Sequence, residues 1–378
     1  MNILFITDAD ISPLDGGVER VTNNLAVEFK KRNINSYLAF VSTITTPSSQ
    51  EFIDKIQLKG TNWENLLLNF LNNNHIHCII VNVMKKKNIK NILPRVYHIT
   101  RNINCKVLFC YHSMPGYEIY GNQFIIRFLK WLGFSFIIKK IISLKLKYTL
   151  YSDKIILLSK EYISIYQKFV GKQANEKFGC IPNALSFNEI ANENILQTKE
   201  KEILIVARLD ENKRISLALK IWQKIEISNL FNDWALKIVG GGGDEKKLKH
   251  LSKKLKLKNI SFEGKQNPIE YYKKASIFMM TSAYEGWGLT LTEAQQNGCV
   301  PIAFNSYASL MDIIDDQQNG VIVNNNKIDE YVEALKELMQ NKEKRIFLAK
   351  NGLINCARYH SEKVMEKWVG LLGNLKSS

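Results

Sequence analysis

Hydrophobic residues along the chain form short continuous runs that alternate with stretches where they recur every three or four positions. Runs such as Asn2 to Thr7 and Lys106 to Tyr111 predict strands that are buried on both faces, as in a parallel sheet. After the first run, Leu25 and Phe29 lie at helical spacing, and the basic residues 30–32 predict the end of that helix. This alternation predicts an α/β fold with doubly wound sheets.

The pattern occurs twice, on either side of a polar stretch at 188–202 that we interpret as a linker. Further strands of the first series are expected at 36–41, 76–83 and 154–158. The second series predicts strands at 203–207, 235–239, 277–281 and 300–304, and helices at 215–225, 245–255 and 289–297. A chain of 378 residues exceeds the size at which one core keeps growing.

We therefore expect two Rossmann-like domains, at 1–185 and 202–358, which face each other across a cleft and hinge near 184–202 and 358. In the last segment, Val364, Trp368 and Leu371 lie at helical spacing. This spacing predicts a C-terminal helix, at about 359–378, that packs back on the first domain.

The composition is that of a folded globular protein, with an apolar fraction of 46% and a charged fraction of 23%. Six cysteines without a C-x-x-C pair predict reduced thiols in a cytoplasmic protein. The N-terminus lacks a basic region and a cleavage site, so we interpret it as a strand rather than a signal peptide. No run reaches the roughly 18 apolar residues of a membrane span, so no integral membrane protein is expected.

Basic residues are concentrated in the first half of the chain. Of a net charge of +16, residues 51–150 contribute 15 Lys and Arg against 4 Asp and Glu. Within them, the charged residues of the largely apolar segment 124–147 are all basic, although Arg127, Lys130, Lys139 and Lys140 do not form one stripe. The segment fits either a helix on an anionic bilayer surface or a core helix with a solvated basic face. Nucleic-acid binding is not expected, because no helix-turn-helix, zinc or RNP pattern accompanies the charge.

Two carboxylates, Glu285 and Glu293, lie in a segment that begins as a glycine-containing loop and continues as a helix; from position 283 it reads A-Y-E-G-W-G-L-T-L-T-E-A-Q-Q-N. Eight helical positions span ~12 Å, about the reach of a sugar nucleotide from hexose to ribose. Taken alone, the pair also fits the general acid and base of a hydrolase.

Two cations follow the first strand of the second series. Arg208 lies one residue past the strand 203–207, and Lys213 lies near the start of the next helix. Because the carboxyl ends of strands line the ligand crevice of an open α/β sheet, these cations are placed to neutralise a diphosphate. The alternative is that Arg208 and Lys213 are ordinary surface residues of a basic protein.

Glycines and one histidine are further candidates. Gly16 and Gly17 open the first helix, where their amides either receive a phosphate or form a simple turn. For residues 240–243 we favour a tight strand-to-helix turn, with phosphate contact at Gly240 as the alternative. His112 ends a predicted strand beside a Pro-Gly turn and is expected to point into the crevice.

No metal site is expected. The D-x-D sequence at Asp8 and Asp10 is typical of some metal sites, but it directly follows the first strand and precedes the glycine loop, so we interpret it as loop. No spacing among the histidines resembles a set of metal ligands.

Taken in order, the motifs resemble those of family 4 glycosyltransferases, a retaining, GT-B-fold, nucleotide-sugar-dependent family with members that act on bacterial surface polysaccharide or lipopolysaccharide. The resemblance covers nearly the whole chain. It rests on G-G-V-E-R-V at 16–21, Y-H-S at 111–113, I-P-N at 181–183, A-R-L-D-E-N-K at 207–213, V-G-G-G-G-D at 239–244 and E-G-W-G-L-T-L-T-E-A at 285–294.

The resemblance implies that the donor diphosphate binds Arg208 and Lys213, and that Glu293 binds the ribose hydroxyls. Glu285 would lie beside the transferred sugar, and His112 would touch that sugar from the first domain. The remaining implied donor contacts are backbone positions at Gly16, Gly17, Gly240, Trp287, Gly288, Leu289 and Thr290. After Phe304 the sequence departs from the family pattern, so no donor contact is carried over to Tyr307 or Ser309.

The expected function is therefore the metal-independent transfer of a hexose-type sugar from a nucleotide sugar, with UDP favoured by family frequency, to a hydroxyl of a glycan or glycolipid. No cofactor is expected. The basic first domain would hold the protein against the inner face of the plasma membrane. The alternatives are a nucleotide-sugar epimerase or glycan phosphorylase on the same fold, and an inactive membrane-associated scaffold.

Overall fold

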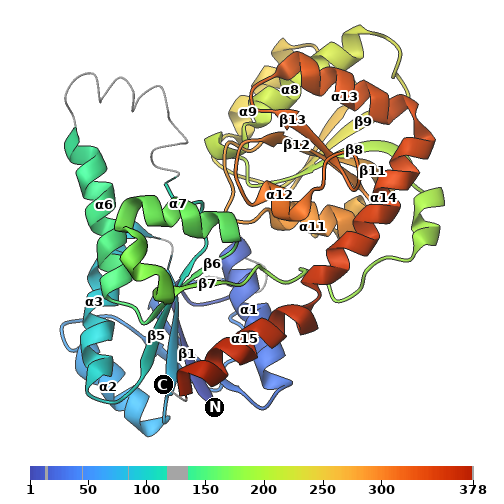
Figure 1. The fold of residues 1–378 in the computed structure, drawn as a ribbon. Coiled ribbons are helices and arrows are strands. Elements are labelled where there is room, and N and C mark those ends of the chain that lie inside the picture. Colours follow the sequence, from blue (N-terminus) through green and yellow to red (C-terminus); the bar gives the residue numbers. More distant parts are fainter. Residues whose placement is uncertain (13–15, 45, 84, 117–134, 377–378) are drawn as a thin grey trace. The chain divides into compact units, whose positions relative to one another are not determined.

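The computed structural model describes residues 1–12, 16–44, 46–83, 85–116 and 135–376, which form two compact units (Figure 1). Unit 1 comprises Met1–Ser186 and Ser361–Ser378, and unit 2 comprises Phe187–His360. The C-terminal segment therefore belongs to the same unit as the N-terminus.

Unit 1 contains a parallel sheet with the strand order β3-β2-β1-β4-β5-β6-β7. Its strands are β1 (Asn2–Ala9), β2 (Asn35–Ser42), β3 (Lys55–Gln57), β4 (Cys78–Asn82), β5 (Lys106–Tyr111), β6 (Lys154–Leu157) and β7 (Phe178–Cys180). Its helices are α1 (Gly17–Lys30), α2 (Trp63–Asn73), α3 (Lys86–Arg101), α6 (Ser135–Leu150), α7 (Lys160–Val170), η1 (Lys172–Lys177) and α15 (Ser361–Lys376).

Unit 2 contains a second parallel sheet with the order β10-β9-β8-β11-β12-β13. Its strands are β8 (Glu200–Val206), β9 (Ala235–Val239), β10 (Ile260–Gly264), β11 (Ala275–Met280), β12 (Val300–Asn305) and β13 (Val321–Asn324). Its helices are η2 (Glu193–Gln197), η3 (Glu211–Lys213), α8 (Ile215–Ile227), α9 (Glu245–Lys254), α10 (Ile269–Lys274), α11 (Leu289–Gln296), α12 (Leu310–Ile313), α13 (Ile328–Gln340), α14 (Lys342–Cys356) and η4 (Ala357–Tyr359).

Both sheets reverse their strand order once, between β1 and β4 in unit 1 and between β8 and β11 in unit 2. The prediction of two doubly wound, Rossmann-like α/β units is confirmed. Ligands of such sheets bind beside the reversal, at the carboxyl ends of the strands. In unit 2 those ends lead into residues 207–214, which contain Arg208 and Lys213, and 281–288, which contain Glu285, Trp287 and Gly288.

The sheet of unit 1 buries both faces because alternate residues of each strand point to opposite sides. On one face, Leu108 of β5 belongs to the hydrophobic cluster that also contains residues of α1 and α15. The Trp368 ring of α15 lies edge-on to Phe29 of α1, with 6.4 Å between the ring centroids. On the other face, Phe109 packs against Tyr148 of α6. The C-terminal helix is thus part of the core of unit 1.

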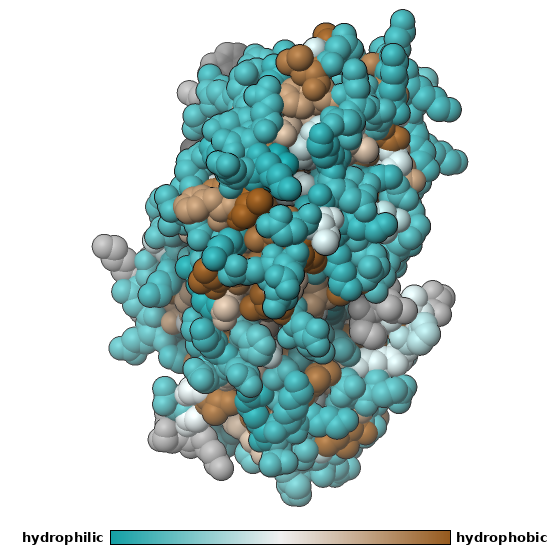
Figure 2. All heavy atoms as spheres, turned by 90° about the vertical axis from the view of Figure 1, so that its right-hand side faces the viewer, coloured by the Kyte–Doolittle hydropathy of each residue, from teal (hydrophilic) through white to brown (hydrophobic). Residues whose placement is uncertain are grey.

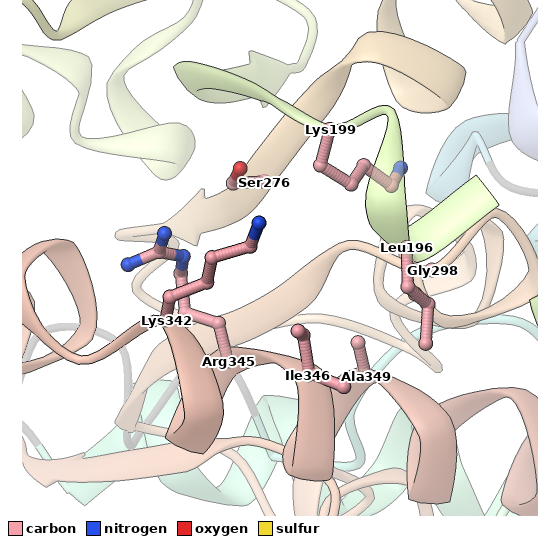
Figure 3. Close-up of a pocket in the computed structure, with 8 residues that line it drawn as sticks. All are labelled: Leu196, Lys199, Ser276, Gly298, Lys342, Arg345, Ile346 and Ala349. Atoms are coloured by element: carbon pink, nitrogen blue, oxygen red, sulfur yellow. The ribbon is translucent and has the colours of Figure 1, made fainter. Parts of the chain in front are cut away.

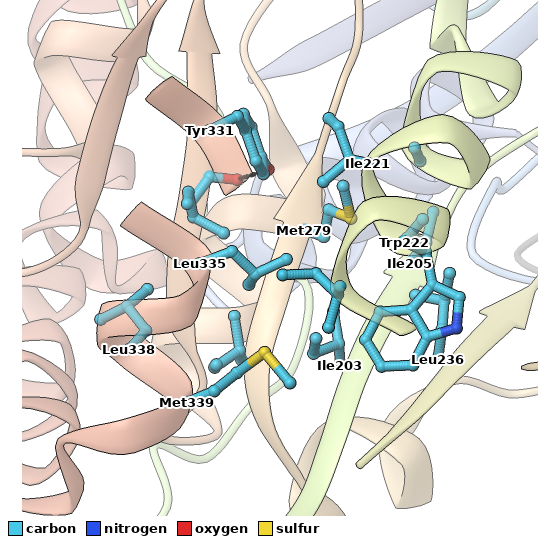
Figure 4. Packing of buried hydrophobic residues seen from close by; sticks show 14 of the residues in the cluster. Ile203, Ile205, Ile221, Trp222, Leu236, Met279, Tyr331, Leu335, Leu338 and Met339 are labelled. Atoms are coloured by element: carbon cyan, nitrogen blue, oxygen red, sulfur yellow. Dashed lines mark hydrogen bonds between the residues drawn. The ribbon is translucent and has the colours of Figure 1, made fainter. Parts of the chain in front are cut away.

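The core of unit 2 lies between its sheet and the helices α8 and α13, whose side chains meet over β8, β9 and β11 (Figure 4). Trp222 of α8 is fully buried there. Tyr331 of α13 is also fully buried, and its hydroxyl donates to the Ile302 carbonyl at 2.8 Å. Leu348 and Leu353 of α14 belong to the same cluster, and α14 also contacts α11. Residues 207–214 and 281–288 therefore follow strands that are held in a closely packed core.

The predicted linker is partly structured and belongs to unit 2. It contains η2, and β8 begins at Glu200 rather than at residue 203. The segment is held against α11, because Gln296 Nε2 donates to the carbonyls of Phe187 and Glu189 at 2.6 and 2.8 Å. These contacts rely on a side chain about 100 residues away, which the local sequence does not reveal.

Some large hydrophobic side chains are exposed at the surface. Met311, Phe347 and Ile354 of α12 and α14 are 50–63% exposed. Figure 2 shows hydrophobic side chains gathered in small groups on an otherwise largely hydrophilic face. Within the described ranges, no helix combines the length and the apolarity needed to cross a bilayer.

The segment 124–147 is described only from residue 135 onward, as part of α6, so Arg127 and Lys130 lie outside the described residues. Lys139 and Lys140 are exposed. Lys145 is fully buried, donates to the Tyr111 hydroxyl, and lies 4.2 Å from the centroid of that ring. The described part of α6 thus packs one side into the core of unit 1, with Lys145 buried, and exposes Lys139 and Lys140.

Candidate functional site

The carboxyl ends of β8 and β11 lead into two loops that are bonded to each other. Asn212 Nδ2 donates to the Tyr284 carbonyl at 3.0 Å, and the Ala283 amide donates to the Asn212 carbonyl at 2.8 Å. The Thr281 hydroxyl donates to the Lys213 carbonyl at 2.9 Å. The loops therefore form one continuous edge at the point where the strand order of unit 2 reverses.

The Arg214 side chain binds the loop that follows β11. It has a left-handed backbone conformation, with φ 48°, at the start of α8. Its Nε donates to the Thr281 carbonyl at 2.6 Å, and its Nη2 donates to the Ser282 carbonyl at 2.8 Å. Burial lowers the pKa of Arg214 to about 10, so the side chain stays charged at neutral pH. The local sequence does not reveal this role of Arg214, because it depends on carbonyls about 67 residues further along the chain.

Lys213 and Glu285 meet on this edge. Lys213 Nζ lies 2.5 Å from Glu285 Oε1, and the two side chains are 20% and 14% exposed. Both residues line a pocket with Thr290, beside the last residues of β8 and β11. A predicted diphosphate ligand and a predicted sugar neighbour thus lie side by side, at the carboxyl ends of the strands.

Arg208 lies apart from this pair. Its Nε is 2.5 Å from Asp210 Oδ2, and its side chain is 76% exposed. Arg208 does not line the pocket that contains Lys213. In this structure the two predicted diphosphate ligands therefore differ: Lys213 is half-buried in the site, and Arg208 extends into solvent on the same loop.

The N-terminus of α11 faces the same edge. Gly288 precedes the helix with φ 103°, a conformation that favours glycine, and no side chain caps the first turn. The amides of Leu289 and Thr290 belong to this uncapped turn, and the partial positive charge of a helix N-terminus attracts anions. The Trp287 side chain is buried and packs edge-on against Tyr359, with ring centroids 5.1 Å apart, so only its backbone is placed at the edge.

The residues after Phe304 support this loop from inside. The Ser309 hydroxyl donates to the Trp287 carbonyl at 3.2 Å. The Tyr307 hydroxyl lies 3.2 Å from Met280 Sδ. Both side chains are buried. The unusual sequence at this point therefore builds the wall behind the α11 N-terminus.

Glu293 is fully buried one turn further along α11. Tyr272 of α10 donates its hydroxyl to Glu293 Oε2 at 2.9 Å, and Tyr272 is itself fully buried. The carboxylate is thus held in a fixed orientation by a residue that sequence reasoning missed. Tyr272 follows Tyr271 in a short helix, and nothing in the local pattern shows which of the two tyrosines points inward.

The glycines of the loop at 240–243 have a packing role. Gly240 has φ 136°, and a Cβ there would lie 1.9 Å from the Ala207 carbonyl oxygen. A Cβ at Gly242 would lie 2.4 Å from the Leu209 carbonyl oxygen. The Leu209 amide donates to the Gly241 carbonyl at 3.0 Å. This close backbone approach holds the loop that begins with Arg208, as the tight-turn interpretation predicts.

Gly16 and Gly17 lie at the N-terminus of α1 in unit 1, where Gly16 precedes the helix and Gly17 is its first residue. Gly16 has φ −58°, which any residue can adopt, and no side chain caps the helix. A Cβ at Gly16 would lie 2.8 Å from the Glu19 carboxylate, the flexible end of a side chain. Turn geometry therefore does not require glycine at this position.

His112 follows β5, near the strand reversal of unit 1. Its Nε2 lies 3.1 Å from Asn82 Oδ1, while Asn82 Nδ2 donates to the Thr22 hydroxyl at 2.9 Å. Burial lowers the pKa of His112 to about 4, so the ring is neutral at pH 7. Because the Asn82 oxygen only accepts, Nε2 carries the proton and Nδ1 is left as an acceptor.

The low pKa of His112 predicts a loss of stability in mild acid. The unfolded chain binds a proton near pH 6.5 and the folded chain only near pH 4, so the free energy of unfolding falls as the pH falls through this window. We expect His112→Gln to remove on the order of 2 kcal/mol of that decrease. Urea denaturation at pH 7 and pH 4.5 measures it, with the exposed His250→Gln as control. Equal pH dependence in the two variants would contradict the prediction.

The aspartates of the D-x-D sequence are engaged in separate loop contacts. Asp8 accepts hydrogen bonds from the Lys85 amide at 2.9 Å and from Asn88 Nδ2 at 2.7 Å. Asp10 accepts from the Ile11 amide at 2.8 Å and lies 3.3 Å from Lys55 Nζ. Over the ranges that the structure describes, no group of three or more His, Cys, Asp or Glu side chains is arranged to hold a metal ion.

Residues 186–353 match the family model described as glycosyl transferases group 1. An uncharacterized glycosyltransferase of Haemophilus influenzae is 31% identical over 223 residues, which are 58% of this chain and 61% of that protein. A Campylobacter jejuni α-1,4-N-acetyl-D-galactosaminyltransferase, named for an undecaprenol-diphosphate-linked substrate, is 26% identical over 60% of this chain and 62% of its own length. The chain thus spans about three-fifths of each of these relatives.

A solved structure has a similar fold over both units. A mutant of S. aureus TarM, in complex with fondaparinux, α-GlcNAc-glycerol and UDP, superposes with a TM-score of 0.76 at 14% sequence identity. The match covers 98% of this chain and 100% of that chain. Residues 186–353 are therefore similar to the group 1 glycosyl transferases, and the chain has the GT-B fold.

Proposed function

We propose that the protein is a retaining glycosyltransferase that moves a hexose-type sugar from a UDP-sugar to a hydroxyl of a glycan or lipid-linked glycan in cell-surface polysaccharide synthesis. The observation that carries the proposal is the pairing of Lys213 with Glu285 beside the uncapped N-terminus of α11, at the strand reversal of unit 2. The likeness of residues 186–353 to group 1 glycosyl transferases supports the reaction class.

The proposed chemistry follows from where charge develops. Breaking the bond between the sugar and the donor phosphate builds negative charge on the departing diphosphate and positive charge on the anomeric carbon. Lys213 and the first amides of α11 are held in place to stabilise the negative charge. Glu285, at 2.5 Å from Lys213, lies on the same edge to orient the sugar. His112 would accept a hydrogen bond from a sugar hydroxyl through Nδ1.

We propose that the sugar keeps its anomeric configuration without a covalent intermediate. None of the residues assigned to the reaction is a candidate nucleophile. Glu285 is engaged with Lys213, and the Glu293 carboxylate is buried against Tyr272. We therefore propose that the acceptor hydroxyl attacks from the side that the diphosphate leaves, with a departing phosphate oxygen taking its proton. The reaction balances: the acceptor O–H and the sugar–phosphate bond break, and the glycosidic bond and a protonated nucleoside diphosphate form.

A donor panel tests the function. Thermal denaturation with UDP, GDP and their sugar derivatives should single out one base, because a ligand at 100 times its Kd stabilises the folded state by ~2.7 kcal/mol. Transfer of a labelled sugar to a lipid-linked glycan should follow. A changed free sugar nucleotide would favour an epimerase, and a requirement for phosphate would favour a phosphorylase. The absence of any nucleotide-dependent shift would support the scaffold alternative.

Tyr272 offers a finer test of the donor site. If Glu293 binds the ribose, Tyr272→Phe should weaken UDP binding about 5- to 10-fold, because the carboxylate loses the hydrogen bond that orients it. The adjacent Tyr271→Phe is the matched control, since the Tyr271 hydroxyl bonds Glu263 and Gln266 instead. Calorimetric titration with UDP measures both variants. Equal UDP affinities in the two variants would contradict the proposed contact between Glu293 and the ribose.

We also propose that the exposed face of α6 contacts an anionic membrane on the cytoplasmic side. Lys139, Lys140 and Lys147 are exposed on this helix, together with Leu146 and Leu150 at 38% and 62% exposure. Basic and apolar side chains on one surface suit an interfacial position. Co-sedimentation with vesicles that contain phosphatidylglycerol should decrease on Lys147→Glu, while vesicles of phosphatidylcholine alone should not bind.

A further inference from the structure

A second pocket of unit 2 lies near the amino ends of the strands, away from the edge that contains Lys213. It is lined by residues before β8, at the start of β11, before β12 and along the first turns of α14: Leu196, Lys199, Ser276, Gly298, Lys342, Arg345, Ile346 and Ala349 (Figure 3). Three of these side chains are cationic and none is acidic. The proposed transfer reaction uses none of them.

The cations of this pocket lack counter-charges. In the part of the chain that the structure describes, Lys199, Lys342 and Arg345 form no ion pair. Other lysines of α14 do: Lys344 pairs with Glu337 at 2.7 Å, and Lys350 pairs with Glu193 at 3.1 Å. Lys199 and Arg345 are partly buried, and Lys342 is exposed beside them. Removing a cation from water without a counter-charge is unfavourable, so a pocket with two such groups gains from binding an anion.

Two of the cations are held in place by backbone carbonyls. Lys199 Nζ donates to the carbonyls of Tyr272 at 2.7 Å and Asn297 at 2.6 Å. Arg345 Nη1 donates to the carbonyls of Leu338 and Met339 at 2.6 and 2.9 Å. Burial lowers the pKa of both side chains. Their positions are thus fixed before any ligand arrives, which reduces the entropy lost on binding.

The groups with free donors gather on one side of the pocket. In Figure 3 the Lys342 ammonium and the Arg345 guanidinium lie on the Ser276 side, whereas Lys199 extends toward Leu196 and Gly298. Among the described residues, Lys342 Nζ and the Nε and Nη2 atoms of Arg345 have no hydrogen-bond partner. The ends of these two side chains can therefore donate directly to a ligand, and Lys199 adds its charge from the other side.

We propose that this pocket binds a phosphate group, either as inorganic phosphate or as a phosphate monoester. A compact dianion matches two donating cations and a third nearby charge, and Arg and Lys are the side chains best suited to phosphate oxygens. The remaining wall is apolar, formed by Leu196, Ile346 and Ala349. This wall suits the carbon chain of an ester.

Lys342 is the residue to substitute, because it is exposed and forms no ion pair with any residue that the structure describes. Calorimetric titration with inorganic phosphate, at constant ionic strength in chloride, uses the full chain with Lys213→Ala to weaken phosphate binding at the proposed donor site. Adding Lys342→Ala should weaken phosphate binding at least about tenfold. The control Lys344→Ala removes the same charge from the same helix and should leave the affinity unchanged.

Butyl phosphate is the second probe. If the natural ligand is a free anion, inorganic phosphate should bind at least as tightly; if it is an organic phosphate, the ester should bind more tightly because it covers the apolar wall. In both cases, the Lys342→Ala and Lys344→Ala variants should differ in their affinity for the phosphate probe. Equal affinities in the two variants, or no heat of binding beyond that of chloride, would overturn the proposal.

Discussion

Replacing Lys213 by alanine is expected to lower kcat/KM for sugar transfer about 1000-fold. The variant removes the half-buried cation at the strand reversal of unit 2 and leaves Glu285 without its partner at 2.5 Å. Loss of one preorganised charge-stabilising group costs about 3–4 kcal/mol of transition-state stabilisation. Most of the loss should appear in kcat, because charge develops on the diphosphate only as the sugar leaves. Steady-state transfer of a labelled sugar measures it.

Two companion variants decide what the Lys213 result means. Lys224→Ala removes a lysine of α8 that pairs with Asp329 on the surface, and it should leave transfer unchanged. Arg208→Ala should lower kcat/KM only about tenfold, because this side chain is 76% exposed and engaged with Asp210. If Arg208→Ala proved as damaging as Lys213→Ala, the loop would have to rearrange on donor binding. An unchanged kcat/KM for sugar transfer in Lys213→Ala would contradict the proposed mechanism.

The sequence predicts the inner strands of both sheets, because strands buried on both faces produce continuous apolar runs. It does not predict the four edge strands β3, β7, β10 and β13, which are short and mostly only partly buried. It also predicts that Lys213 lies at the carboxyl end of a strand and that Glu285 lies in the loop before a helix. It does not predict that they touch, since the pair is 72 residues apart and depends on β8 lying next to β11. That neighbour relation follows from the strand order of the sheet, and a one-dimensional pattern does not specify it.

Side-chain direction is the part that the sequence does not determine. Lys145 lies in a strongly basic segment, yet its side chain is buried, donates to the Tyr111 hydroxyl and lies over that ring. Arg208 reads as a phosphate ligand, yet an aspartate two positions later holds it in solvent. Each side-chain direction depends on a contact with a neighbouring residue. The periodicity and composition of the sequence do not specify that contact.

A further expected result concerns the glycine loop, where Gly240→Ala should destabilise unit 2 by at least ~3 kcal/mol. The residue has φ 136°, a conformation that L side chains rarely adopt, and its Cβ would lie 1.9 Å from the Ala207 carbonyl oxygen and 2.9 Å from the Ala207 carbonyl carbon. Backbone strain of this kind costs about 1–3 kcal/mol, and relieving the overlap requires β8 and the β9 loop to separate. Urea denaturation followed by Trp fluorescence measures the change.

Gly243→Ala is the matched control, because it makes the same substitution three residues along the same loop. A Cβ at Gly243 meets no atom within 4 Å, and its φ is not in the left-handed range, so its stability should stay within about 0.5 kcal/mol of the parent. Equal stabilities in the two variants would show that the loop yields easily, and glycine at 240 would then need another reason, such as phosphate contact. A selective loss at Gly240 instead means that the close approach to Ala207 fixes the loop carrying Arg208 and Lys213.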